Sequence, residues 1–81
     1  MPRFYFNVIT DHGRILDDEG TELPTLDEAR AEALEDAREL MSGAILEGRD
    51  ISGRRVEICS ESGETLMIVP FAAAISRDSQ I

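Results

Sequence analysis

Few residues in this chain have side chains suited to catalysis, and they lie far apart in the sequence. The chain has one cysteine, Cys59, and one histidine, His12. Cys59 could serve as a nucleophile, but no motif pairs it with His12. Asp11 could orient His12 as a general base, although adjacent residues in a turn rarely point toward each other. We therefore expect no enzymatic activity and no catalytic residues.

Candidate ligands for metal ions are also scarce. One cysteine and one histidine are too few for a conventional zinc site. Asp17, Asp18 and Glu19 could offer carboxylate oxygens to Ca²⁺ or Mg²⁺, but their spacing differs from that of an EF-hand loop. A solvated acidic loop is the simpler interpretation, and we expect no cofactor.

Length and charge limit the classes of protein further. The 81 residues suffice for one small domain, in which we expect residues 2–75 to be ordered and residues 76–81 to form a tail. Eight basic and 17 acidic residues give a formal net charge of −9. Because nucleic acids and anionic membranes bind positive surfaces, neither is expected as a partner. The longest apolar run, residues 66–75, is too short to span a membrane, and we expect a cytoplasmic protein.

The N-terminal part has the pattern of a β-hairpin. Phe4, Phe6 and Val8 recur at every second position, which predicts a strand over residues 3–9 with one face in the core. A turn at residues 11–13 and a short strand over residues 14–17 follow. Residues 17–22 have four acids and no periodicity, and we expect a solvated loop.

A long helix is predicted after this loop. Thr25 and Glu28 form a capping box before a run rich in alanine, leucine and glutamate, so the helix begins at Leu26. Its alanines form one apolar stripe, and its acids lie on the opposite side. The helix would be longer than the strands, and it either kinks near Gly43 or ends at Gly48.

Arg30 is the one charged residue that falls inside the apolar stripe of this helix. A buried cation without a partner costs several kcal/mol, so Arg30 must reach solvent or a carboxylate. We expect it to hold the acidic loop of residues 17–22 against the helix start; alternatively, it serves as a ligand for an anion.

The C-terminal part predicts a second hairpin. Its strands cover residues 54–60 and 66–71, and Gly63 occupies a left-handed position in a three-residue turn. This register places Ile58 opposite Leu66 and Val56 opposite Ile68 on the core face. The other face then carries six candidate interface residues for a homodimer: Tyr5, Asn7, Ile9, Met67, Val69 and Phe71.

Together these elements predict an α+β fold of order β-β-α-β-β, an antiparallel four-stranded sheet with one long helix packed on one face. With this order, five segments resemble the DUF6894 family of short bacterial proteins of unknown function. The resemblance covers residues 2–71 and implies no activity, ligand or site residue. The segments that carry it are Pro2-Arg3-Phe4-Tyr5-Phe6, the acid-glycine turn, Asp18 to Pro24, the alanine-rich run at residues 29–34, and Leu66 to Phe71.

A weaker resemblance is to the N-terminal domain of HicB-type antitoxins, which have a similar hairpin, Leu-Pro element and helix start. Two features depart from that pattern, because an acidic loop replaces the third strand and no DNA-binding segment follows. We expect a non-enzymatic interaction or regulatory module that acts as a homodimer. The alternatives are a small-ligand or metal-binding domain that uses Arg30 and the acidic loop, and an antitoxin-like domain that neutralises a toxin.

Overall fold

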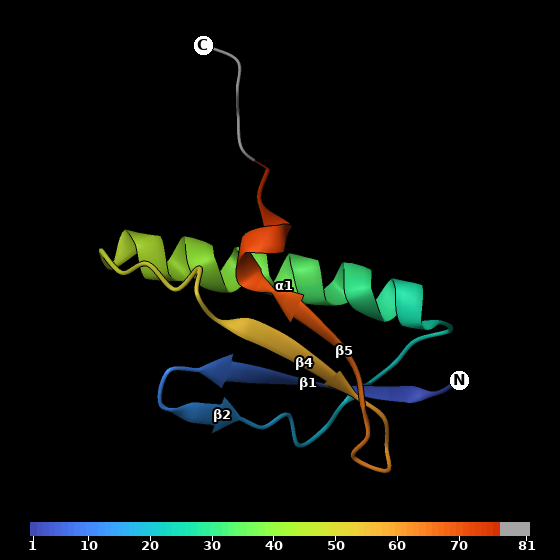
Figure 1. Ribbon diagram of the computed structural model, residues 1–81. Coiled ribbons are helices and arrows are strands. Elements are labelled where there is room, and N and C mark those ends of the chain that lie inside the picture. Colours follow the sequence, from blue (N-terminus) through green and yellow to red (C-terminus); the bar gives the residue numbers. More distant parts are fainter. Residues whose placement is uncertain (77–81) are drawn as a thin grey trace.

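The computed structural model describes residues 1–76 and shows one antiparallel sheet with a long helix on one face (Figure 1). Pairing follows the order β2-β1-β4-β5, and β3 pairs with the start of β1. The α+β class with one helix on one face is confirmed, whereas residues 77–81 of the expected tail lie outside the described residues. The elements are β1 (Arg3–Thr10), β2 (Gly13–Ile15), β3 (Thr21–Glu22), α1 (Leu26–Leu46), β4 (Arg55–Cys59), β5 (Thr65–Pro70) and the 3₁₀-helix η1 (Phe71–Ala74).

The acidic segment before the helix contains an additional strand, β3. The expectation of a solvated loop over residues 17–22 was therefore wrong for its last two residues. Thr21 and Glu22 form β3, which pairs with Phe4 and Arg3 of β1. The eight-residue β1 is much longer than the three-residue β2, which pairs only with its last residues. Because the backbone groups at the start of β1 also need partners, β3 continues the same edge, and the order is β-β-β-α-β-β.

The helix begins and ends at local sequence signals. The Thr25 hydroxyl accepts a 3.1 Å bond from the Glu28 N–H, as the capping box predicts. There is no break at Gly43, and α1 continues to Leu46. Gly48 adopts φ +80°, and the N–H groups of Gly48 and Arg49 donate to the carbonyls of Ile45 and Ala44. This Schellman motif confirms the second alternative, an end at Gly48.

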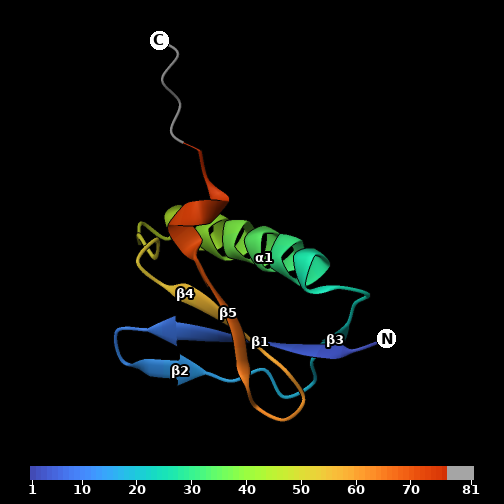
Figure 2. The same ribbon diagram turned by 45° about the vertical axis from the view of Figure 1, so that its right-hand side comes forward.

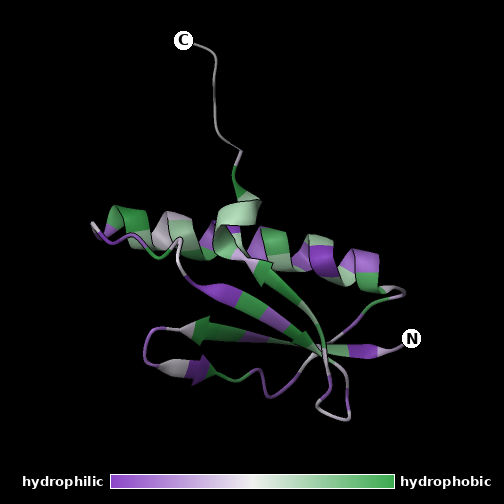
Figure 3. Ribbon diagram, in the orientation of Figure 1, coloured by the Kyte–Doolittle hydropathy of each residue, from purple (hydrophilic) through white to green (hydrophobic). Residues whose placement is uncertain are grey.

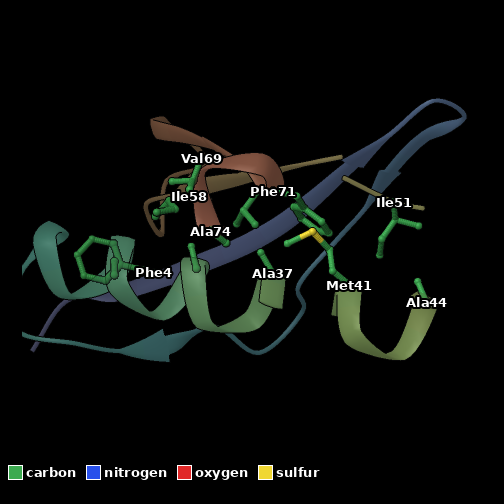
Figure 4. Packing of buried hydrophobic residues seen from close by; sticks show 12 residues of the cluster. Phe4, Ala37, Met41, Ala44, Ile51, Ile58, Val69, Phe71 and Ala74 are labelled. Carbon is green, nitrogen blue, oxygen red and sulfur yellow. The ribbon is translucent and has the colours of Figure 1, made fainter. Parts of the chain in front are cut away.

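The core lies between α1, η1 and the helix-facing side of β4 and β5 (Figure 4). The buried stripe of α1 consists mostly of alanines, whose small side chains let η1 and the strands approach the helix closely. Polar and apolar residues alternate along the helix (Figure 3), so only this narrow stripe is buried. The buried apolar residues outside α1 are Phe4, Ile51, Val56, Ile58, Cys59, Val69, Phe71 and Ala74.

The register of the second hairpin differs from the prediction by one residue. The turn forms as expected, with Gly63 at φ +88° and Cys59 paired with Thr65. The register then shifts, because Ile58 pairs with Met67 and leaves Leu66 as an extra residue of β5. A shift of one residue exchanges the two faces of a strand, so the predicted pairs of Ile58 with Leu66 and Val56 with Ile68 were wrong.

This shift moves three candidate interface residues into the core. Val69 is 2% exposed and Phe71 is fully buried, while Met67 packs against the same cluster. Phe71 also belongs to η1 and not to the strand, and the turn of η1 carries its ring toward α1. Met67, Val69 and Phe71 are therefore absent from the helix-free face, where Ile68 is exposed instead.

Candidate functional site

The helix-free face of the sheet is polar at its centre. Tyr5, Asn7 and Ile9 lie on the side of β1 opposite Phe4, as predicted, and they pair with Cys59, Glu57 and Arg55 of β4. Asn7 and Glu57 are 8% and 7% exposed, although α1 and η1 both lie on the other side of the sheet. Their neighbours in the sheet must therefore shield them.

The side chains of Asn7, Arg14, Glu57, Cys59 and Thr65 form one polar cluster on this face. One carboxylate oxygen of Glu57 accepts bonds from Asn7 Nδ2 at 3.2 Å and Arg14 Nη1 at 2.8 Å, and the other accepts from Thr65 Oγ1 at 2.9 Å. The bond from Asn7 contributes most to lowering the pKa of Glu57, and those from Thr65 and Arg14 add to it despite opposing desolvation. Glu57 is thus a charged and satisfied group at neutral pH.

Cys59 is shielded by its own chain and is not activated as a nucleophile. Its Sγ lies 3.6 Å from Asn7 Nδ2 and 3.9 Å from Thr65 Oγ1. Burial raises the pKa of the thiol, and the nearby Glu57 carboxylate raises it further. Cys59 pairs with Tyr5, whereas His12 lies in the exposed turn beyond the opposite end of β1, so the structure does not bring the two together.

Asp17 is a structural residue, and the pattern of acids alone did not distinguish it from its neighbours. Its carboxylate accepts bonds from the N–H groups of Phe6, Glu19 and Gly20, each at 3.1 Å, and its own N–H donates to Asn7 Oδ1. Desolvation raises the pKa of Asp17, but the three backbone bonds together lower it below the ordinary value. Asp17 therefore connects the acidic segment to β1 and to the polar cluster.

The three weak metal candidates do not form a metal site in the structure. Asp18 and Glu19 are exposed, and both oxygens of Asp17 accept bonds from backbone N–H groups. Over residues 1–76, no three or more histidine, cysteine or acidic side chains converge in a way that could hold a metal ion. The backbone also approaches closely here, because a Cβ on Gly20 (φ +70°) would lie 2.9 Å from side-chain atoms of Arg3 and Tyr5.

The expected clamp between Arg30 and the acidic loop is absent. Arg30 is exposed, and in the described part of the chain its side chain makes no hydrogen bond or ion pair. The buried stripe of α1 is too narrow to include Arg30, so the side chain reaches solvent directly. Arg3 contacts the loop instead, with Nη1 donating to the Glu19 carbonyl at 3.0 Å and Nη2 lying 3.6 Å from Glu22.

A second surface feature lies on the other side of the sheet, beside α1. The helix packs mainly on η1, β4 and β5, and β2 is the strand farthest from it (Figures 1 and 2). A groove of about 310 Å³ follows the uncovered margin of the helix. We call this feature the acidic groove; it is lined by Phe6, Val8, Asp36, Glu39, Leu40 and Val56.

Asp36 is expected to make stability depend on pH. Desolvation, followed by the charges of Glu32, Glu39, Glu35 and Asp17, raises its pKa from 3.8 to about 6. Between these values the folded chain holds a proton on Asp36 that the unfolded chain releases, so the contribution of Asp36 to stability increases as pH falls from about 7 to about 4. Because the site is partly exposed and screened, the gain is about 1 kcal/mol.

Urea unfolding of the Asp36→Asn protein at several pH values measures this effect. Its stability should vary less with pH than that of the wild type, while the matched change Glu64→Gln in the exposed hairpin turn should leave the pH dependence intact. Equal pH profiles for wild type and Asp36→Asn would contradict the assignment.

No curated protein and no solved structure matches this chain. Within the described residues, no helix is both long enough and apolar enough to cross a membrane. Residues 3–72, which include all five strands and α1, match the model of a family described as a domain of unknown function. The chain belongs to that family, DUF6894.

Proposed function

We propose that this domain is a non-enzymatic protein-interaction module that forms a homodimer through the helix-free face of its sheet. The observation that supports this proposal is the distribution of charge on that face. The exposed Arg55 pairs with Ile9 at one end of the face, whereas the Arg14 side chain reaches Glu57 at the centre. Asp18 and Glu61 lie with Tyr5 and Cys59 around a hollow of about 330 Å³ toward the other end, and Arg14 lines the hollow as well.

A twofold axis makes this distribution self-complementary. β4 runs from Arg55 to Cys59, and Glu61 follows just beyond its end. An axis through the middle of β4 would place the basic end of one copy over the acidic end of the other, as an isologous interface requires. Opposite charges would then meet at both ends, which offsets part of the repulsion between two chains of net charge −9.

The centre of the face suits such a contact because its polar atoms already have hydrogen-bond partners within the same chain. The polar cluster is satisfied within one chain, so covering it leaves no unpaired carboxylate or amide. Ile68 is 41% exposed and pairs with Glu57, which places an apolar side chain beside the cluster. Exposed apolar area of this kind favours association.

A charge exchange tests the homodimer. Arg55→Glu and Glu61→Arg should each weaken dimerisation about tenfold or more, because each places like charges together. The double variant should restore it, since the two ends are merely exchanged. Light scattering over a range of concentrations gives the mass, and Arg30→Glu, an exposed change on the helix, is the control. A monomeric wild type at high micromolar concentration, or no restoration in the double variant, would overturn the proposal.

The alternative functions have less support. A small-ligand or metal-binding role for Arg30 and the acidic loop loses its premise, because Arg30 points to solvent and Asp17 binds backbone groups. The neutralisation of a toxin stays a prediction from the layout of the elements alone.

A further inference from the structure

The helix-facing side of the sheet is only half covered. α1 and η1 pack over β4 and β5, and Phe4 at the start of β1 belongs to the same core, which leaves the later part of β1 and β2 open on this side (Figure 2). Phe6 and Val8 face this side and are only partly buried, and Ile15, paired with Val8, is 57% exposed. The apolar pattern of β1 thus continues onto a surface that no element of residues 1–76 covers.

The width of this open strip matches a single helix. Neighbouring strands lie about 4.8 Å apart, so the three residue pairs that join β1 and β2 provide a strip about 10 Å wide, close to the diameter of an α-helix. Helices on one face of a sheet pack side by side at axial distances of about 8–10 Å. A second helix next to α1 would therefore fill the acidic groove and contact Leu40, which is 46% exposed.

The charge beside the groove determines the chemistry of that helix. Asp36 and Glu39 line the groove, and Glu32 and Glu35 lie one turn away on α1. The Asp17 carboxylate, bound at the edge of β1, does not line the groove, but its charge contributes to the raised pKa of Asp36. In the described residues no basic side chain forms an ion pair with any of these five acids.

We propose that the acidic groove binds a basic amphipathic helix of another protein. Its apolar side chains would cover Phe6, Val8 and Leu40, and its lysines or arginines would lie against Asp36 and Glu39. A second copy of this chain is the wrong occupant, because its own helix presents acids to the groove and like charges would meet. This surface lies on the opposite side of the sheet from the proposed homodimer interface.

A pair of synthetic helices tests the proposal. Both are roughly 15-residue peptides with leucine at every third or fourth position, and they carry either lysine or glutamate at the flanking positions. Fluorescence anisotropy with labelled peptides measures binding to the full chain. We expect the lysine peptide to bind at least about tenfold more tightly than the glutamate peptide.

Matched variants separate the groove from general attraction to an acidic protein. The variant D36N/E39Q should weaken binding of the lysine peptide by about tenfold, while D11N/E64Q, with the same change in net charge at two exposed turn residues, should leave it nearly unchanged. D36N/E39Q removes like-charge repulsion on α1, so it is expected to fold. Equal binding of the two peptides, or equal effects of the two variants, would overturn the proposal.

Leu40→Asp distinguishes the other possible occupant. We expect this change to weaken binding of the lysine peptide and to leave the oligomeric mass measured by light scattering unchanged. A dimer that is lost in Leu40→Asp but retained in Arg55→Glu would show a second copy in the groove and overturn the inference. The homodimer proposal is tested separately by Arg55 and Glu61, so either proposal can fail alone.

Discussion

Replacing Phe71 by alanine is expected to leave most of the protein unfolded or close to unfolding at 37 °C. The ring is fully buried between α1 and the strands, where it packs with residues such as Ala37 and Ala74. Removing a buried phenylalanine costs about 3–5 kcal/mol. A domain of 81 residues has a total stability of about 4–12 kcal/mol, so this loss is a large share of it.

Thermal unfolding followed by circular dichroism measures this effect, and the Tm should fall by about 15 °C or more. Ile75→Ala is the control, because Ile75 is 57% exposed and its removal should change stability by less than about 1 kcal/mol. The sequence pattern alone placed Phe71 at a dimer interface. Alanine at such a position would change the oligomeric mass and leave the stability of the fold nearly unchanged. A small change in Tm would mean that the ring is not in the core.

Replacing Asp17 by alanine is expected to cost about 2–3 kcal/mol. The Asp17 carboxylate accepts three backbone N–H groups, and hydrogen bonds to a charged group contribute about 1.5–3 kcal/mol each. Water can replace part of this loss because the side chain is only partly buried. Without Asp17, the segment between β2 and β3 loses its attachment to β1.

Asp18→Ala provides a matched control, since Asp18 is exposed and adjacent, and it should change stability by about 0.5 kcal/mol or less. The sign of the pH effect follows from the lowered pKa of Asp17. Its contribution is fully present above the ordinary carboxyl pKa and is lost as pH falls through the lower folded value. Urea unfolding should thus show a large difference in the free energy of unfolding between wild type and Asp17→Ala at pH 7, and a smaller difference at pH 3. Equal differences would contradict the assignment.

The two proposed surfaces use opposite sides of one sheet, and the polar cluster explains why they differ. On the helix-free side, Glu57 is already held by Asn7, Arg14 and Thr65, so that side offers a satisfied centre with charges at its ends. On the helix side, the charged groups that raise the pKa of Asp36 are all acids, and Asp36 lies beside partly exposed apolar residues. The helix-free side therefore favours contact with a second copy of the chain, and the helix side favours a basic partner helix.

The sequence by itself determined the features that depend on neighbouring residues. Thr25 and Glu28 located the helix start, and the alternation of Phe4, Phe6 and Val8 located β1. Gly48 was one of two alternatives for the helix, and the structure selected it. Each of these signals works within a few residues, because a cap or a strand face needs no distant partner. The family was also recognisable from short segments in order.

Only the tertiary structure decided which side chains meet across the sheet. Because Leu66 is an extra residue in β5, Val69 faces the helix. Thr21 forms a strand because it pairs with Phe4 at the start of β1. Because α1 lies over β4 and β5, Arg30 faces solvent and a groove lies beside Asp36. These outcomes depend on residues far apart in the chain, where a shift of one position in pairing exchanges core and surface, and local patterns do not contain that information.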